Sequence, residues 1–499
     1  MKVLSASIAL VCAVPFSLVQ TPTQTSLPGA GQEPLRGEAK MMMGLLDLND
    51  NGRLEKNELE GDARDMLEEL DGDEDGTISA EELSRINEDV VDVNSKLAAI
   101  DTRIGDRRIV DLPKGIHRGF NRHFVRYTNV LAPNGKPIHV LAMSKWSDDR
   151  IVRVRKVLEH FLRDAPGREW GNKTKLANEM ANNHATLVLL NNQRDMDRVM
   201  PSIEDVNLQL QDLRANESPF EGEDDYMKHE TRDAAYEEVF HLIHGSGILH
   251  AMRPYDRAIR ARARQAAASG LWNFDEPNMP GNHFEYIICV FDNYVDLWKT
   301  KPMKMESNRL PRQPRGESFM GEYRADDRSS THKADPIGFS LVEKFNPDHI
   351  GYSAELPAGF DGTFSIAPGS GQRYADKAKH LRNVTLAGSI NASLTGNQFD
   401  NRLVGNAANN VLQGNGGDDS LFGGEGEDTA VFRGKRADYM IANTASLVQV
   451  HDSMVNRDGY DVLSGIEVLK FSDSSVRVGE LDSTRSKSAH GIETKKRSP

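Results

Sequence analysis

Hydrophobic and polar positions in the middle of the chain recur with helical spacing. Apolar residues return every three to four positions over 148–164, 232–244, 256–270 and 285–298, which predicts four amphipathic helices. A continuous apolar run, HATLVLLN at 184–191, predicts a buried strand between Asn-rich turns. Because strands and helices alternate little here, the pattern predicts a central α+β domain over 110–375.

A second pattern, near the C-terminus, has a period of nine residues. The segments GNQFDNRLV (396–404), GNAANNVLQ (405–413), GNGGDDSLF (414–422) and GGEGEDTAV (423–431) align without gaps. The apolar position of the repeat is occupied by Leu394, Leu403, Leu412, Leu421 and Ala430, and the sixth position by Asn401, Asn410, Asp419 and Asp428. Each repeat thus offers glycines for a tight turn and one apolar side chain for a thin core.

These repeats resemble the RTX (haemolysin-type) family, whose nonapeptide is G-G-x-G-x-D-x-U-x. The resemblance implies an all-β parallel β-roll with capping strands over 383–480 and calcium at its turns, with Asp419 and Asp428 as ligands. The repeats with Asn at the sixth position are expected to form coils held by amides without metal. The last residues, 481–499, are expected to be a disordered tail.

Two acidic segments near the N-terminus have the spacing of calcium-binding loops. DLNDNGRLEKNE (47–58) and DGDEDGTISAEE (71–82) both fit D-x-[DN]-x-[DN]-G-x5-E. Hard oxygen ligands at these spacings suit calcium. The expected ligands are Asp47, Asn49, Asn51, the backbone carbonyl of Arg53 and Glu58 in the first loop, and Asp71, Asp73, Asp75, Thr77 and Glu82 in the second.

These loops resemble the EF-hand family, which implies a short all-α EF-hand pair over 37–90. The loops start 24 residues apart, so a single helix over 59–70 must serve both. The first loop carries less charge and is expected to bind calcium more weakly than the second. We expect a stabilising site rather than a calcium sensor.

Acidic residues are concentrated in this same region. Between Glu38 and Glu88 there are 17 Asp/Glu against 5 Lys/Arg, so this segment carries −12 of the formal net charge of −14. The remainder of the chain is close to neutral, which argues against nucleic acid as a partner.

The first residues predict export. MKVLSASIALVCAVPFSLVQ has a lysine followed by a short apolar run, which is typical of a signal peptide over 1–22, and a polar linker follows at 23–36. No other run approaches membrane-spanning length, so no transmembrane segment is expected beyond the signal peptide. Once the signal is removed Cys289 is the single cysteine, which excludes a disulfide framework. The expected location is extracellular or at the cell surface.

The candidate chemistry lies in AAYEEVFHLIHG at 234–245. On a helix with about 100° per residue, Glu237, His241 and His244 fall in one narrow stripe. In the zinc motif H-E-x-x-H the ligands occupy i and i+4 and the general base occupies i+1. Glu237 would replace the first histidine, with His241 as the second ligand and Glu238 as the candidate base.

Glu285 opens a later helix, 44 residues after His241. With it, the segment Asp233–Trp298 resembles the zincins of the anthrax-lethal-factor-like group, whose third zinc ligand is a glutamate. The resemblance implies a zincin-like central domain in which Glu238 deprotonates a zinc-bound water that attacks a peptide carbonyl.

The glutamate in place of the first histidine leaves two alternatives open. Glu237, His241, His244 and Glu285 could form a structural metal site, or the histidines could be hydrogen-bonded residues of a packed helix. The protein is therefore either an exported zinc-dependent peptidase acting on a protein or peptide in calcium-rich surroundings, or a non-enzymatic, calcium-stabilised binding or surface protein. The sequence does not set the oligomeric state.

Overall fold

The structure, a computed structural model, describes residues 37–59, 70–84, 90–203, 205–274, 281–305, 308–309, 315–444 and 447–481. The predicted signal peptide and linker, most of the predicted helix at 59–70, and residues 482–499 of the predicted tail lie outside the described residues. The chain divides into two compact units, one of Met1–Ser218 and Thr231–Pro347 and the other of Pro219–Glu230 and Asp348–Pro499. Within the described ranges, no helix combines the length and the apolar character needed to cross a membrane.

The first unit is built around a mixed five-stranded sheet. Its strands, in spatial order, are β3 (Val110–Asp111), β4 (Arg126–Leu131), β5 (Pro137–Ala142), β6 (Ala185–Leu190) and β7 (Gln209–Arg214). The last three are parallel, and β4 pairs antiparallel with both β3 and β5. The strand predicted at 184–191 is β6, and all of its residues are buried because both faces of the sheet are covered.

Helices cover the two faces of this sheet. The strands are contacted by α7 (Asp148–Leu162), α8 (Thr174–Asn182) and α11 (Ala235–Ile243). A separate apolar core joins Val188 and Leu190 of β6 to α5 (Asn94–Ala98), α6 (Arg118–His123) and α9 (Gln193–Val199). Alternate residues of β6 thus face different helices, as the two-residue period of a strand requires.

A further group of helices packs against α11. It consists of α13 (Arg253–Ala268), α14 (Asn282–Tyr294), α15 (Arg328–Ala334) and α16 (Pro336–Phe345). Together with α7 and α11, α13 and α14 correspond to the four helices that periodicity predicts, and the central domain is α+β as expected. The ring of Phe161 in α7 lies 5.3 Å from that of Phe240 in α11 and 5.0 Å from that of Phe291 in α14, so one aromatic cluster holds these three helices together.

The calcium-loop segment belongs to the same unit. It contains α2 (Gly37–Leu46), β1 (Arg53–Glu55), β2 (Thr77–Ser79) and α4 (Ala80–Ser84). β1 and β2 pair antiparallel, with Leu54 opposite Ile78, so the two loops lie back to back although only one short segment connects them. Leu54 and Ile78 share an apolar core with Leu249 and Phe284 of the central domain.

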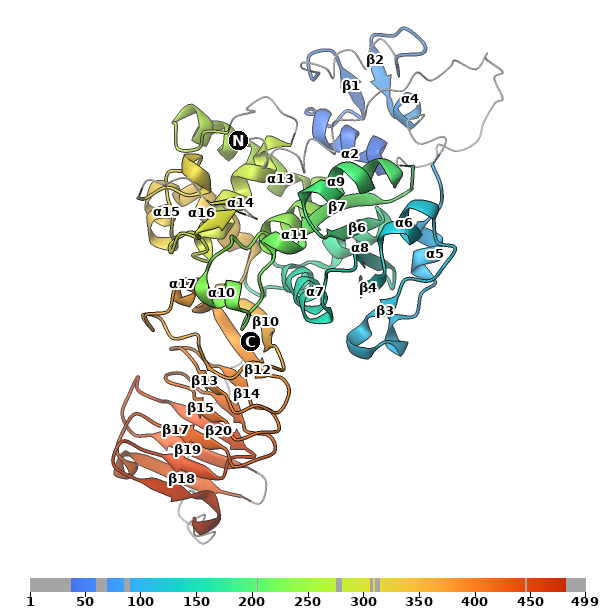
Figure 1. The fold of residues 1–499 in the computed structure, drawn as a ribbon. Coiled ribbons are helices and arrows are strands. Elements are labelled where there is room, and N and C mark those ends of the chain that lie inside the picture. Colours follow the sequence, from blue (N-terminus) through green and yellow to red (C-terminus); the bar gives the residue numbers. More distant parts are fainter. Residues whose placement is uncertain are drawn as a thin grey trace. The chain divides into compact units, whose positions relative to one another are not determined.

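The second unit is a roll of two sheets (Figure 1). In spatial order, the first sheet contains β10 (Ile350–Leu356), β12 (Leu381–Leu386), β14 (Arg402–Val404), β16 (Ser420–Phe422), β20 (Tyr460–Ser464), β19 (Val448–Asp452) and β18 (Tyr439–Asn443). The second contains β11 (Thr363–Ser365), β13 (Ser393–Thr395), β15 (Val411–Gln413), β17 (Thr429–Val431), β21 (Val468–Lys470) and β22 (Ser475–Arg477).

The repeated apolar residues stack inside this roll. Leu403 lies beside Leu421 in the first sheet, and Leu412 lies beside Leu394 and Ala430 in the second, all of them fully or almost fully buried. The strands that carry the repeats are parallel, as expected for a β-roll.

The roll departs from the nonapeptide pattern at both ends. It begins with β10, well before residue 383, because β10 and β11 pair in parallel with β12 and β13. The segment Pro219–Glu230 also belongs to this unit, and it packs Tyr226 of α10 (Asp224–Lys228) against Phe364 and Tyr374. After β17 the antiparallel strands β18 and β19 are inserted before the parallel order resumes with β20.

Candidate metal sites

The helix α11 presents its polar residues on one side. Tyr236 and Phe240 pack into the aromatic cluster with Phe161, so the rest of the helix must face other parts of the interior. Every residue of α11 is buried, including Glu237, Glu238 and His241. Ionisable residues are almost never fully buried unless they have charged partners or a metal.

Three of the predicted zinc ligands meet at one point. Glu237 and His241 of α11 and Glu285 of α14 each place a ligand atom within 4.8 Å of the others, and each is at most 3% exposed. The Nε2 atom of His241 lies 3.8 Å from a carboxylate oxygen of Glu285. Residues 44 positions apart in sequence are therefore neighbours, as the spacing predicts.

This group has polar atoms that lack hydrogen-bond partners. Neither ring nitrogen of His241 makes a hydrogen bond within the described residues, and neither does Oε1 of Glu285. Leaving such atoms buried and unsatisfied is costly. A cation with nitrogen and carboxylate ligands would satisfy them, so the residues present fit a divalent metal of the zinc type.

The electrostatics of the group also favour a cation. Burial lowers the pKa of His241, but the carboxylates of Glu285 and Glu238 outweigh it and raise that pKa to about 9. Burial, opposed by His241, raises the pKa of Glu285. These residues by themselves therefore hold extra protons at neutral pH, where a bound divalent ion would compensate the negative charge instead.

The predicted base lies beside this group. Oε2 of Glu238 is 3.5 Å from Nδ1 of His241 and accepts a 2.8 Å hydrogen bond from the side-chain amide of Gln211 in β7. Burial raises the pKa of Glu238, but His241 and nearby arginines outweigh it, so the pKa is lowered and the carboxylate is ionised. Gln211 thereby fixes the orientation of the carboxylate that the sequence gives as a candidate base.

Glu237 differs from a simple metal ligand. Its carboxylate forms a buried ion pair with Arg232, which lies just before α11. Burial lowers the pKa of Arg232, but Glu237 and Asp292 outweigh it and the pKa is raised, so the guanidinium stays charged. The arginine partly neutralises the extra negative charge that a glutamate brings in place of a histidine.

A cavity of about 40 Å³ lies next to His241. Its lining contains Gln211 of β7 and Phe284 of α14, together with Met41 and Leu45 of α2. A cavity of this size holds at most a few water molecules. In this arrangement the first helix of the EF-hand segment covers the site.

Polar contacts hold that covering segment in place. Asp50, in the first calcium loop, forms ion pairs with both Arg253 and Arg257 of α13. Arg260, on the same face of α13, donates a 2.9 Å hydrogen bond to the backbone carbonyl of Leu45. Lys40 of α2 pairs with Glu179 of α8.

His244 is separated from the other three predicted zinc ligands, which corrects the four-residue group expected from the sequence. The regular turns of α11 end at Ile243, and a π-helix, η7 (His244–Ile248), begins with His244. His244 also lies about 4.5 Å farther along the helix axis than His241. A regular helix with 100° per residue does not predict that the partners of His244 differ from those of His241.

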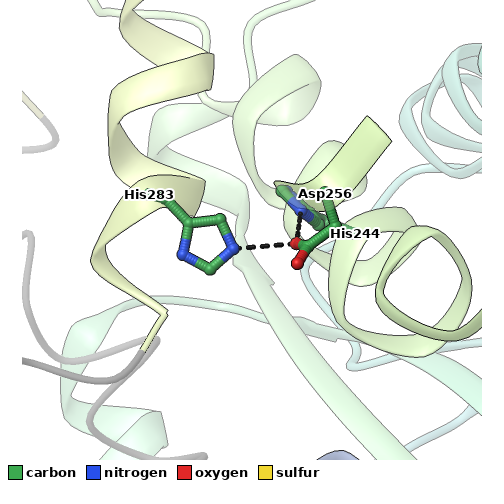
Figure 2. Close-up of side chains that lie close together, drawn as sticks. All are labelled: His244, Asp256 and His283. Carbon is green, nitrogen blue, oxygen red and sulfur yellow. Dashed lines mark hydrogen bonds and ion pairs between the residues drawn. The ribbon is translucent and has the colours of Figure 1, made fainter. Parts of the chain in front are cut away.

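His244 instead joins a second buried group (Figure 2). Its Nε2 and that of His283 in α14 each lie 2.9 Å from the same carboxylate oxygen of Asp256 in α13. Burial lowers the pKa of His283 to about 3, so that imidazole is neutral at physiological pH. Arg260 donates to the other oxygen of Asp256, so this group is a hydrogen-bonded brace between η7, α13 and α14.

The two calcium loops have matching internal geometry. In the first, Asp47 accepts from the backbone N–H groups of Asn51 and Gly52, and Glu58 accepts from that of Leu48. In the second, the same hydrogen bonds join Asp71 to Asp75 and Gly76, and Glu82 to Gly72. Ligand atoms of Asp71, Asp73 and Glu82 come within 4.8 Å of one another.

Some predicted ligands in the loops have other partners. The amides of Asn49 and Asn51 donate to Glu55, and the side chain of Arg53 donates to Asp75 and Thr77 of the second loop. Calcium would compete with Arg53 for the carboxylate of Asp75.

Aspartates line the turns of the roll. Asp419 and Asp428 are at most 1% exposed, and Oδ2 of each has no hydrogen-bond partner among the described residues. Burial, with neighbouring carboxylates, raises the pKa of Asp419 to about 7 and that of Asp428 to about 6.

Several residues of these sites belong to no motif that is visible in the sequence. Asp256 and His283, like Gln211 and Arg232, follow no motif and are brought in by tertiary packing alone. Asp461 and Glu467 did leave a signal: Asp461-Val462-Leu463 and Glu467-Val468-Leu469 repeat the acid-x-apolar spacing of Asp419-Ser420-Leu421. The inserted strands hide it by interrupting the nine-residue period.

Comparison with known protein families identifies both calcium-binding modules. The family model described as the RTX calcium-binding nonapeptide repeat (4 copies) matches residues 395–430, and the EF-hand model matches residues 63–87. These matches confirm the RTX repeats and an EF hand that includes the second loop, and they support calcium as a ligand of the chain.

No curated protein matches the chain. Among solved structures, the extracellular lipase LipA from Serratia marcescens is similar at 19% identity and a TM-score of 0.10. The similarity covers 16% of this chain and 14% of the length of that lipase.

Proposed function

We propose that the chain is an exported calcium-binding protein whose central domain holds a zinc-type divalent metal between Glu237, His241 and Glu285. The observation that carries the metal site is the position of His241. Both of its ring nitrogens are buried and make no hydrogen bond with the part of the chain that the structure describes, and two glutamates place ligand atoms within 4.8 Å of it. One imidazole and two carboxylates form a ligand set that zinc accepts.

Export is supported by two features of the sequence. RTX repeats are typical of secreted proteins, and the pattern of residues 1–22 is that of a signal peptide. Calcium is abundant outside cells, so the EF-hand and RTX modules would become loaded, and stabilised, after export.

A zinc-dependent peptidase is the second candidate function, and the position of Glu238 favours it. A bound zinc ion would lower the pKa of a coordinated water. Glu238, ionised and oriented by Gln211, is placed to accept a proton from a group next to His241. The competing function is a non-enzymatic binding or surface protein, in which the same metal braces α11 against α14.

Substrate would need a path to this site. Met41 and Leu45 of α2 line the cavity beside His241, and the cavity is too small for a peptide. A peptidase would therefore require α2 to move away. The ion pairs of Asp50 with α13 oppose that movement.

Metal analysis of the purified full chain tests the metal site. We expect one equivalent of zinc in the parent protein, lost in His241→Ala and in Glu285→Gln, and retained in His332→Ala, which removes an exposed histidine. A folded parent protein that binds no zinc would contradict the proposal.

Hydrolysis of a peptide library by the same samples separates the two candidates. A peptidase should lose activity in Glu238→Gln while keeping its zinc, whereas a structural metal gives no hydrolysis in either protein. Export is tested by N-terminal sequencing of the chain recovered from the medium of a secreting host, where a new N-terminus near residue 22 is expected.

A further inference from the structure

The turns of the roll are of two kinds. In the first kind, called Asn-closed here, asparagine occupies both the second and the sixth position of the turn. In the turn that begins at Gly396, the backbone N–H of Asn397 donates a 2.8 Å hydrogen bond to the side-chain oxygen of Asn401. The amide of Asn397 donates in turn to the carbonyls of Lys379 and Leu381, at 3.0 and 2.9 Å. An N–H donor therefore lies between this turn and the preceding coil.

The turn that begins at Gly405 repeats this arrangement. The N–H of Asn406 donates to the side-chain oxygen of Asn410 at 2.7 Å, and the amide of Asn406 donates to the carbonyls of Ala387 and Ile390. At each of these turns an asparagine amide thus satisfies two carbonyl oxygens of the preceding coil. The sixth position of these two turns is a neutral amide, so it leaves no buried charge for a cation to compensate.

In the next two turns, as far as the described residues show, no backbone N–H of the same turn donates to the sixth position, although the amide of Asn415 still donates to the carbonyl of Gly396. Oδ1 of Asp419 accepts the N–H of Asn401, and Oδ1 of Asp428 accepts the N–H of Asn410, both at 2.7 Å. The second oxygen of each aspartate is buried and receives no hydrogen bond from the described residues. A buried carboxylate oxygen without a donor is costly unless a cation binds there.

The same pattern of hydrogen bonds continues beyond the repeats. The N–H of Asp419 donates to the carboxylate of Asp461 at 2.9 Å, as the N–H of Asn401 does to Asp419. On the other sheet the N–H of Asp428 donates to the carboxylate of Glu467 at 2.8 Å. Asp461 and Glu467 therefore occupy the next sixth positions, although the inserted strands separate them from the repeats in sequence.

We propose that Asp461 and Glu467 complete two calcium sites with Asp419 and Asp428, and that the Asn-closed turns before them bind no calcium. This inference rests on the proposed binding of calcium by the roll and adds its location and two ligands. The formal charges match, because each site pairs two carboxylates with one divalent cation. The backbone carbonyls of the glycine-rich turns can supply further oxygen ligands, which calcium requires.

Counting bound calcium in full-length variants tests this location. In a background with both EF-hand loops disabled by Glu58→Gln and Glu82→Gln, equilibrium dialysis measures the calcium held by the roll. We expect two equivalents, falling to one in Asp461→Asn and in Glu467→Gln, and to none when both are changed. Both substitutions keep the oxygen that accepts the backbone N–H.

Two further variants serve as controls for the calcium count. Glu427→Gln removes an exposed carboxylate next to Asp428 and should leave two equivalents, as should Asn401→Ala. Calcium that stays bound in the Asp461→Asn, Glu467→Gln double variant overturns the inference alone. A roll that binds no calcium before these changes overturns calcium binding by the roll as well.

If a variant fails to fold, the calcium sites can be located in crystals of the parent chain instead. In crystals grown with terbium, a calcium substitute, anomalous scattering should show ions beside Asp461 and Glu467 and none at the turns closed by Asn397 and Asn406. Ions at the Asn turns would overturn the inference.

Discussion

The carboxylate of Asp50, in the first EF-hand loop, forms an ion pair with the guanidinium of Arg253, in α13 of the central domain. The same carboxylate pairs with Arg257. Together with the contacts of Arg260 and Lys40, this residue of a calcium loop holds α2 over the cavity beside His241. Access to the candidate metal site is linked to the docking of this loop.

Removal of this link should open the site. In Asp50→Ala, loss of a partly exposed ion pair weakens docking by roughly 1 kcal/mol, which raises the population of the undocked state about fivefold. We expect zinc to be extracted by a chromogenic chelator faster by a similar factor, measured by stopped-flow absorbance.

Glu74 provides the matched control. It occupies the same position of the second loop and has a similar left-handed backbone, with φ of 56° against 61° for Asp50. It is exposed. Glu74→Ala should leave the extraction rate unchanged, and an equal acceleration in both variants would mean that loop folding, not docking, controls access.

Replacing the two aspartates of the roll should make it independent of calcium. Asp419→Asn and Asp428→Asn together remove two buried carboxylate charges, which should stabilise the calcium-free roll by about 1 kcal/mol or more at each position. The melting temperature in EGTA should rise, and the stabilisation by added calcium should fall. The change is measured by calorimetry of the full chain, with Glu427→Gln as the control.

Loss of an amide from an Asn-closed turn should destabilise the roll whether or not calcium is present. Asn397→Ala removes two hydrogen bonds donated to carbonyls and two accepted from Phe399 and Asn401, so we expect a loss of about 2 kcal/mol or more. Asn409→Ala removes one exposed hydrogen bond, to the N–H of Glu427, and should cost less. Urea unfolding in saturating calcium and in EGTA would show whether the loss is the same in both.

The buried pair of Arg153 and Asp233 should be essential to the central domain. The guanidinium donates two hydrogen bonds to the carboxylate just before α11, and both side chains are at most 5% exposed. Arg153→Met leaves Asp233 buried without this partner and should lower the free energy of unfolding by about 3–5 kcal/mol.

An exposed ion pair provides the control for the Arg153→Met variant. Arg103 and Asp101 form a similar ion pair, but the side chain of Arg103 is 84% exposed. Arg103→Met should leave the chemical denaturation midpoint unchanged. An equally small effect of Arg153→Met would contradict the role of the buried pair.

Local patterns in the sequence predicted much of this fold. The four helices and β6 follow from apolar periodicity, and the stacking of Leu403 and Leu412 follows from the nine-residue repeat. The spacing of Glu237, His241 and Glu285 also brought together the residues that meet in the structure. In each case the predictive pattern lies within one helix, one strand or one repeat, or it is the residue spacing of a known motif.

Other features depend on packing between distant segments. His244 joins Asp256 and His283 because η7 interrupts the regular turns of α11 and three helices converge there. The covering of the cavity by Met41 depends on how the EF-hand segment docks. Neither has a local signature, whereas the missed Asp461 had one that the inserted strands concealed.

In each sheet of the roll, the parallel order of the coil strands ends at an antiparallel strand pair. β19 runs antiparallel to β20 and is followed by β18 at the edge of one sheet, and β22 runs antiparallel to β21 at the edge of the other. A stack of parallel coils is in principle open-ended, since each exposed edge can accept another coil from the same chain or from a neighbouring molecule. The antiparallel pairs interrupt the parallel hydrogen-bonding pattern at this end of both sheets, so we expect them to oppose the addition of a further parallel coil there.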